Sequence, residues 1–438
     1  MNSWPKIFLT FSAVLCLLSL GTLGWLALET TAPETAQPAT AATQKTWNVQ
    51  PQAAQQQGEG SKKNGSTQSL PLASDEDDLE ESLDSLNQSK AVALRELVLK
   101  FTSPEALNAF RARAAQAGIE VLFSDARLGT ARVRYRDSAR MAAELRQHPG
   151  DYEKIAPNYL AWVPGLPRQP QTDASNAGGS IPFESSGLDM IGAQGDRSRW
   201  GAGVKVAVLD TGITDHEILT GVKITRQDFI KDGQPLHGHG TAMASLIAGK
   251  DPTHGGVAPQ SELLDVRVAD SKGVGDTATV AQGILWAVDR GARVINISLG
   301  ASGDSVMLRD AVQYAQSRGV IVVAAAGNEQ ADQVAYPAGY PGVISVAAVD
   351  AQGRQAYFSN SGEVFISAPG VGIISAYSEG KTVIGSGTSQ AAAIASGAVS
   401  ALLSRNYSST AIPQVLQKNA LPTGAPASQL GAGILRLP

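Results

Sequence analysis

The fold follows from VAVLDTGI at residues 206–213, an apolar strand that ends in an acidic residue and a tight turn. Similar apolar runs recur at residues 294–298, 320–326 and 343–349. Because helical stretches separate these runs, the sequence predicts an α/β fold with a mostly parallel sheet and helices on both faces. Reactive groups of such sheets lie just beyond the carboxyl ends of strands, where Asp210, Ser298 and Asn328 occur.

Composition agrees with this class and excludes others. At 438 residues the chain is long enough for two or three structural units. Charged residues make up only 17%, which suits buried strands. The net charge of -5 offers no basic surface, so we expect no nucleic-acid partner. Cys16 is the only cysteine, which rules out an intrachain disulfide.

The polar residues at these strand ends belong to a set that acyl transfer at an amide requires. His239 stands between two glycines at the start of a small-residue helical run, and Ser389 stands on a glycine-flanked turn before another. An imidazole can take the serine proton and return it to the leaving amine. Asp210 would orient that ring, and Asn328 would donate a side-chain N–H to the oxyanion beside the Ser389 amide.

Each of these residues also has a purely structural interpretation. Asp210 before Thr-Gly is typical of a turn or cap, and Asn328 after Gly is typical of a turn. His237 is a second candidate base. It has a glycine on one side only, whereas His239 has one on each side, and His237 is expected in a loop. The joint presence of all four partners favours the catalytic interpretation.

At this point the sequence resembles a known family. The blocks DTGI, GHGT, GVAP, ISLG, AAAGN, SAPG and GTSQA occur in this order within residues 183–404, and they are similar to the signature blocks of the subtilisin-like serine proteases, the subtilases. The order Asp, His, Ser is also the subtilisin order. The resemblance implies a serine endopeptidase that acts on proteins or peptides through an acyl-enzyme. Its roles map onto Asp210 as orienter, His239 as base and acid, Ser389 as nucleophile and Asn328 as oxyanion donor.

The resemblance also implies where a substrate would lie. An extended peptide would pair as a third strand between two segments, Gly273-Val274-Gly275 and Ser298-Leu299-Gly300. The pocket for the residue before the scissile bond would be walled by the second segment and by Ala325-Ala326-Gly327, with Ala335 near its floor. Because no acidic group is among these residues, we expect a preference for apolar or aromatic residues over Arg and Lys.

Some features depart from the family pattern. Ala393 replaces the usual proline in the block after the serine. This departure leaves open how rigidly the turn positions Ser389. The loop at residues 250–255 is shorter than in calcium-binding relatives and offers only Asp251, so the resemblance implies no required cofactor and leaves calcium open. Two other functions stay open: a narrow-specificity processing protease for one partner protein, and a catalytically silent surface-binding protein.

The first ninety residues predict an export segment and a tether. Residues 7–28 form an uncharged run long enough to cross a bilayer, so residues 1–28 are predicted as a signal anchor or signal peptide. Lys6 on one side and acidic residues on the other place the rest of the chain outside the cytoplasm, anchored to the membrane or secreted after cleavage. Residues 29–90 are polar and then acidic, which predicts a disordered linker.

Residues 91–163 predict a small α+β unit with the order βαββαβ, a ferredoxin-like fold. Its last strand, with APNYL at residues 156–160, resembles the end of a subtilase propeptide. The resemblance implies a chaperone and inhibitor, and a zymogen that cleaves itself in the following linker, residues 164–180. The catalytic domain would span residues 181–438. A permanently attached binding module is the alternative.

Overall fold

The computed structural model describes residues 76–165, 180–251 and 254–438, which all belong to one compact unit. Residues 1–28, where the sequence predicts a signal anchor, lie outside these ranges. Within these three ranges, no helix combines the length and the apolar composition needed to cross a bilayer.

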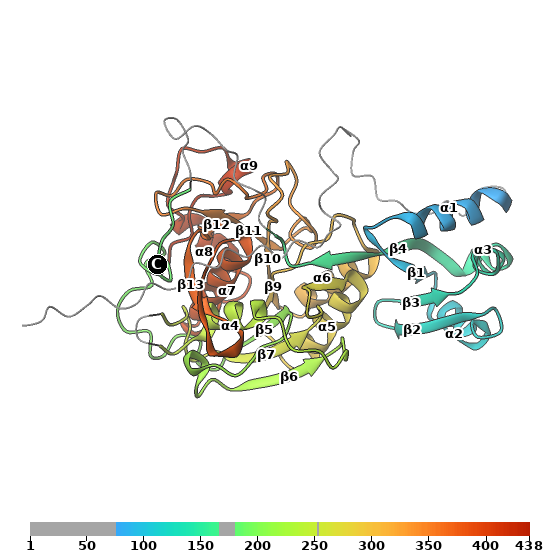
Figure 1. Ribbon diagram of the computed structural model, residues 1–438, viewed down its shortest axis with the longest axis horizontal. Coiled ribbons are helices and arrows are strands. Elements are labelled where there is room, and N and C mark those ends of the chain that lie inside the picture. The colour runs from blue at the N-terminus through green and yellow to red at the C-terminus, as the bar shows by residue number, and fades with distance from the viewer. Residues whose placement is uncertain (1–75, 166–179, 252–253) are drawn as a thin grey trace, which may run out of the picture. The chain divides into compact units, whose positions relative to one another are not determined.

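The larger domain is built on a seven-stranded sheet in which every neighbouring pair is parallel (Figure 1). The strand order is β12-β11-β10-β9-β5-β7-β6. The strands are β5 (Lys205–Asp210), β6 (Ile224–Asp228), β7 (Glu262–Arg267), β9 (Val294–Ile297), β10 (Ile321–Ala325), β11 (Ile344–Val349) and β12 (Ile366–Pro369). The predicted α/β class with a parallel sheet is confirmed.

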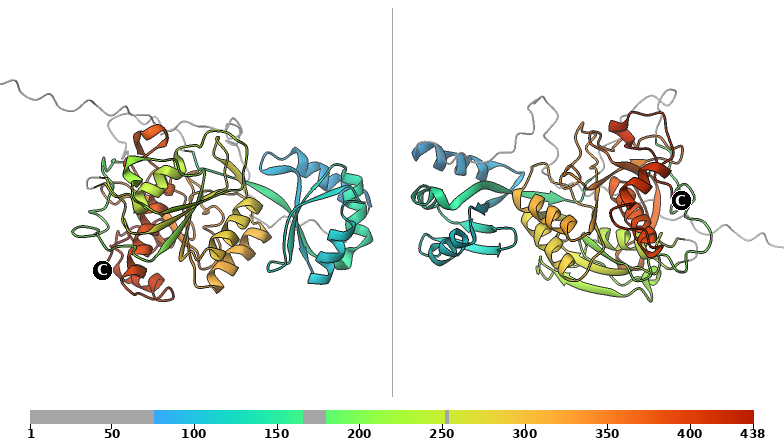
Figure 2. Two further views of the ribbon diagram at one scale, coloured as in Figure 1. Left: turned by 90° about the horizontal axis from the view of Figure 1, so that it is seen from below. Right: turned by 180° about the vertical axis from the view of Figure 1, so that it is seen from behind.

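Helices cover both faces of this sheet (Figure 2). The helices of this domain are α4 (His239–Ala248), α5 (Thr277–Asp289), α6 (Val306–Ser317), α7 (Thr388–Ser404), α8 (Ile412–Asn419) and α9 (Ala427–Leu430). Side chains alternate along β5: Val206 and Val208 join a core with α4 and α7, whereas Ala207 and Leu209 join a core with α5 and α6. Burial on both faces explains why these strands are continuous apolar runs.

Short elements complete the larger domain. Strand β8 (Val274–Asp276) precedes α5, and β13 (Ile373–Ala376) pairs with β14 (Thr382–Gly385) as an antiparallel hairpin. Two single-turn 3₁₀ helices are η2 (Glu217–Leu219) and η3 (Ser378–Gly380).

The small domain has the predicted βαββαβ order. Its elements are β1 (Val92–Phe101), α2 (Pro104–Arg113), β2 (Ile119–Asp125), β3 (Thr130–Tyr135), α3 (Ser138–Gln147), η1 (Pro149–Asp151) and β4 (Tyr152–Trp162). The strands are antiparallel in the order β2-β3-β1-β4, as a ferredoxin-like fold requires. The Ser103 side chain accepts a hydrogen bond from Ala106 N and caps α2, and Asp137 caps α3 in the same way.

The prediction of a disordered linker through residue 90 is wrong at its end. Residues Glu76–Gln88 form helix α1, which packs on α3 and β1. Leu79 and Leu83, four residues apart on one helical face, are buried in the core of the small domain. The acidic residues between them hid this apolar stripe in a reading by composition alone.

Candidate active site

Asp210 and His239 are held together at the start of α4. Asp210 is the last residue of β5 and is fully buried, and His239 is the first residue of α4. The Nδ1 atom of His239 lies 2.8 Å from Oδ1 and 3.0 Å from Oδ2 of Asp210. A Cβ at Gly240 would lie 2.5 Å from the carbonyl oxygen of Gly212, so only glycine allows the helix to approach the turn this closely.

Ser389 is the second residue of α7, and only 2% of it is exposed. Its hydroxyl donates to the carbonyl oxygen of Ser298 over 3.4 Å. The preceding glycine is needed for space, because a Cβ at Gly387 would lie 2.8 Å from Gln390 Oε1 and 3.2 Å from Asn328 Nδ2. Thus the glycine-flanked turn brings the side chains of Ser389 and Asn328 to the same place.

Asn328 follows β10 and is oriented through its own amide oxygen. That oxygen accepts hydrogen bonds of 2.9 Å from both the backbone N–H and the hydroxyl of Thr388. The amide nitrogen therefore points the other way, and it donates to the carbonyl oxygen of Pro164 over 3.1 Å. The amide of Asn328 is therefore an oriented hydrogen-bond donor that faces the cleft.

A segment of the same chain occupies the cleft. Strand β4 pairs antiparallel with β8, with Trp162 opposite Val274 and Ala161 opposite Gly275. Further along, Val163 N donates to the Gly273 carbonyl oxygen over 2.9 Å. On its other edge, Trp162 exchanges two hydrogen bonds of 3.0 Å with Gly300. The end of β4 is therefore a middle strand between two segments of the larger domain.

The other pocket residues proposed from the sequence also meet here. Ser298, Leu299 and Gly300 follow β9, and Ala325, Ala326 and Gly327 end or follow β10. The Ala335 amide donates to the Ala326 carbonyl oxygen over 2.8 Å. A Cβ at Gly300 would lie 3.0 Å from Ala335 Cβ and 3.9 Å from Pro164 Cγ, so these three residues are neighbours.

Sequence reasoning missed the other residues that line this cleft. They include Val163, Pro164, Gly165, Lys272, Val383 and Gln390. The sequence predicts Pro164 as the first residue of a linker, and the family resemblance implies that the end of the preceding strand lies in the cleft as a poor product, but neither gives the register. The antiparallel register that carries this strand into the cleft joins residues more than a hundred positions apart, and no local signal reports it.

His237, the second candidate base, also lines the cleft. Its Nδ1 atom accepts a hydrogen bond from the backbone N–H of His239 over 3.4 Å. Burial, together with a smaller effect of the neighbouring His239, lowers the pKa of His237 to about 4. His237 therefore stays neutral near pH 7, and it is His239 whose ring meets the Asp210 carboxylate.

The described residues contain no group of three or more His, Cys, Asp or Glu side chains that could hold a metal ion. Asp251, the acid of the short loop, accepts a hydrogen bond of 2.7 Å from His254 N through Oδ1.

A parallel sheet whose strand ends and following helices carry an Asp, a His, an Asn and a Ser in this arrangement defines the class of the subtilisin-like serine proteases. Here these residues are Asp210, His239, Asn328 and Ser389. The sequence model of the subtilase family matches residues 201–433. The thermostable alkaline protease of Halalkalibacterium halodurans is 40% identical over 262 residues, which cover 57% of this chain and 71% of that protein. Subtilisin Savinase of Lederbergia lenta is 37% identical over 265 residues, which cover 58% of this chain and 97% of the relative.

Structural comparison agrees with these matches. The crystal structure of fervidolysin from Fervidobacterium pennivorans, described as a keratinolytic enzyme related to subtilisin, matches with a TM-score of 0.67 at 25% sequence identity. The match covers 80% of this chain and 61% of that one. The chain belongs to the subtilase family and is a serine endopeptidase.

Proposed function

We propose that this protease cleaves peptide bonds through an acyl-enzyme on Ser389, with His239 as base and acid and Asp210 as its orienting carboxylate. The proposal depends mainly on two side-chain N–H donors, each of which faces a defined acceptor. His239 Nδ1 faces the Asp210 carboxylate at 2.8 Å, and Asn328 Nδ2 faces a backbone carbonyl oxygen at 3.1 Å. The first leaves Nε2 of the ring free to take a proton, and the second is what an oxyanion requires.

The steps follow from these positions. The Ser389 hydroxyl oxygen adds to the substrate carbonyl carbon while His239 Nε2 takes the hydroxyl proton. Asn328 Nδ2 and the Ser389 amide, at the start of α7, stabilise the negative oxygen. His239 then gives the proton to the leaving amine, and water releases the acyl group by the same path. No cofactor is needed for any of these steps.

We expect the pocket before the scissile bond to prefer apolar residues. Gly300 lies beside both Ala335 and the Pro164 ring, and Ser298, Ala326 and Gly327 complete the proposed walls. None of these side chains carries a negative charge that would pair with Arg or Lys. A panel of chromogenic peptides that differ only at this residue tests the preference, and faster hydrolysis of Arg or Lys peptides would contradict it.

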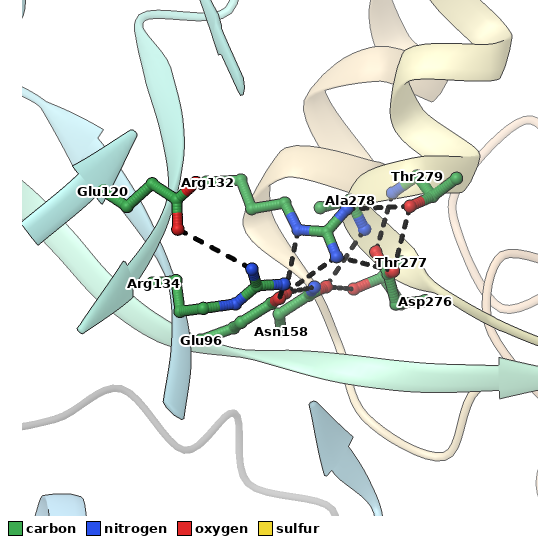
Figure 3. Close-up of polar contacts among 9 residues, drawn as sticks. All are labelled: Glu96, Glu120, Arg132, Arg134, Asn158, Asp276, Thr277, Ala278 and Thr279. Carbon is green, nitrogen blue, oxygen red and sulfur yellow. Dashed lines mark hydrogen bonds and ion pairs between the residues drawn. The ribbon is translucent and has the colours of Figure 1, made fainter. Parts of the chain in front are cut away.

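The small domain acts, in this proposal, as the propeptide. Its contacts with the start of α5 form one polar network (Figure 3). Arg132 donates to Asp276 Oδ2 over 2.9 Å and to Thr279 Oγ1 over 2.8 Å. Asn158 Oδ1 accepts hydrogen bonds of 3.1 Å from Thr277 Oγ1 and Ala278 N. The small domain thus supplies an acceptor for the Ala278 N–H at a helix start, which a protease without it would leave to water.

Two more observations support the propeptide role. The tail of β4 lies in the cleft as a substrate would, which blocks entry. The fervidolysin match covers 80% of this chain, more than residues 180–438 alone can supply. We therefore propose a zymogen that matures by cutting itself after the small domain. A permanently attached module is the alternative, and it predicts a chain that remains whole.

The test is a time course of residues 76–438 beside a Ser389→Ala twin, followed by gel and intact mass. We expect the wild-type chain to split and the twin to remain whole. If both remain whole, the permanently attached module or the silent binding protein explains the chain better. The hypothesis of a catalytically silent binding protein depends on Ala393. That residue lies fully buried within the unbroken helix α7 that carries Ser389.

Substrate breadth separates the remaining alternatives. A general endopeptidase hydrolyses unfolded casein at many bonds, whereas a processing protease for one partner protein leaves casein almost intact. Export is proposed from residues 1–28 as anchor or signal peptide. A carboxyl-terminal tag followed in membrane and soluble fractions tests it, because only full-length protein in the cytoplasmic fraction would contradict export.

A further inference from the structure

The register of β4 in the cleft points to one particular peptide bond. Trp162 and Gly300 exchange two hydrogen bonds, which makes them a hydrogen-bonded antiparallel pair. Pro164, two residues beyond the end of β4, therefore falls opposite Ser298. The carbonyl oxygen of Pro164 is the one that Asn328 Nδ2 holds at 3.1 Å. The carbonyl of Trp162 is already bound by the Gly300 amide, so it does not compete for this donor.

We propose that Pro164–Gly165 is the bond that this enzyme cuts in its own chain, and that Pro164 makes the cut slow. The inference rests on the proposed self-cleavage. It adds which peptide bond is cut and which residue limits the rate of the cut. Val163, Pro164 and Gly165 line the same cleft as His239, Asn328 and Ser389, so reactive and target groups share one site.

The reaction at this bond balances without any added reagent except water. The Ser389 oxygen bonds to the Pro164 carbonyl carbon, and His239 takes the hydroxyl proton. The bond between the Pro164 carbon and the Gly165 nitrogen breaks, and the proton goes to the Gly165 amine. Water then hydrolyses the ester, which leaves a carboxylate on Pro164 and regenerates the Ser389 hydroxyl.

The slow cleavage is explained by the amide hydrogen that Pro164 lacks. In an antiparallel pair of this register, the amide N–H of residue 164 would donate to the Ser298 carbonyl oxygen and continue the ladder. Proline has no N–H, so this hydrogen bond is missing. The Ser298 carbonyl oxygen accepts instead from the Ser389 hydroxyl, over 3.4 Å.

Both consequences slow the attack. The peptide before the scissile bond lacks one hydrogen bond to the protease domain. The hydroxyl proton of Ser389 points at the Ser298 carbonyl oxygen and not at His239. Restoring one hydrogen bond of ordinary strength, which also frees the nucleophile, is expected to speed the first cut by roughly 10-fold. A slow cut would keep the small domain on the protease while the parallel sheet completes its folding.

The experiment compares residues 76–438 of the wild type with Pro164→Ala, which restores the N–H. Pro149→Ala, in η1 of the same domain and outside the cleft, is the matched control, and Ser389→Ala is the inactive reference. Intact mass and amino-terminal sequencing at early times identify the first new terminus. We expect Gly165 in the wild type and in both proline variants, with Pro164→Ala roughly 10-fold faster and Pro149→Ala unchanged.

Each other outcome has a distinct meaning. A Ser389-dependent first cut at another bond, or a Pro164→Ala chain that is cut no faster than the wild type, overturns this inference and leaves the proposed self-cleavage intact. If none of the chains is cut in a Ser389-dependent manner, the proposed self-cleavage itself is wrong, and this inference falls with it. First-order kinetics that do not change on dilution are expected, because the bond lies in the cleft of its own chain.

Discussion

Arg132 of the small domain and Asp276 of the protease domain form an ion pair at 2.9 Å, with both side chains largely shielded from solvent. Asp276 is also the amino-terminal cap of α5, where its Oδ1 accepts a hydrogen bond of 2.8 Å from Thr279 N. Arg132 thus ties the small domain to a carboxylate that the protease already holds in place. Such a pre-oriented partner lowers the entropy lost on association.

Arg132→Met is therefore expected to weaken the hold on the small domain after the chain is cut. Loss of one partner of a shielded ion pair leaves Asp276 without its cation, which predicts roughly 10- to 100-fold faster release. Size-exclusion chromatography of cut chains measures the fraction that stays associated. Arg134→Met is the control, because Arg134 pairs with Glu96 and Glu120 inside the small domain. Equal release from both variants would contradict the prediction.

Asn328→Ala is expected to lower kcat of the mature enzyme by about 10²–10³-fold with little change in KM, because an oxyanion donor acts mainly in the transition state. That magnitude was obtained on a subtilisin, a relative of this chain. Steady-state kinetics on one chromogenic peptide measures it. Circular dichroism and thermal unfolding serve as the control, since Asn328 also accepts from Thr388. A change confined to KM would exclude the proposed role.

Gly300→Ala is expected to narrow the pocket before the scissile bond. A Cβ there would lie 3.0 Å from Ala335 Cβ and 3.9 Å from the ring of the residue now in the pocket, Pro164. Peptides with Phe at this position should lose about 10-fold in kcat/KM relative to peptides with Ala. The ratio of the two values in wild type and variant decides the matter, and an unchanged ratio would mean that Gly300 does not wall the pocket.

Asp265 predicts a pH dependence of stability. This carboxylate on β7 is buried, and its Oδ2 accepts from Ile213 N over 3.1 Å, in the turn that follows Asp210. Its Oδ1 has no hydrogen-bond partner within the part of the chain that the structure describes. Burial raises the pKa of Asp265 to about 7 in spite of the lowering effects of the Ile213 hydrogen bond and of Arg226, and the charges of Asp210 and Asp228 add a smaller upward effect.

The sign follows from proton binding. The native state holds a proton on Asp265 up to about pH 7 and the unfolded state only up to about pH 4, so stability falls as the pH rises between these values. Asp265→Asn removes this dependence, and its advantage over the wild type should be about 2–3 kcal/mol larger at pH 8 than at pH 5.

Denaturant titrations at both pH values, in a Ser389→Ala background, measure the difference for Asp265→Asn. Asp215→Asn is the control, because Asp215 is exposed and also pairs with Arg226. An equal advantage of Asp265→Asn at both pH values would show that Asp265 does not titrate in this range.

Much of this architecture was available from the sequence. The strand that ends at Asp210, the glycines around His239 and the turn before Ser389 are local signals, because each depends on residues next to one another in the chain. The βαββαβ order of the small domain was predicted for the same reason, since apolar periodicity and caps such as Ser103 and Asp137 act within one helix or strand.

Helix α1 shows where the prediction of a disordered linker from local composition was wrong. Its acidic residues predicted a solvated tether, but Leu79 and Leu83 find an apolar surface on the small domain that a short isolated helix lacks. The burial of those side chains offsets the entropy of ordering the segment, and that surface exists only after the domain folds.

The sequence by itself determined the family, the candidate residues for its chemistry and their order in the chain, because subtilase blocks are short and local. Only the tertiary structure decided that Pro164 lies on Asn328, that Arg132 meets Asp276, and that Asp265 supports the turn after Asp210. Those contacts join residues that are far apart in the chain. Their distances depend on strand register and on how the domains pack, and neither is written in any local pattern.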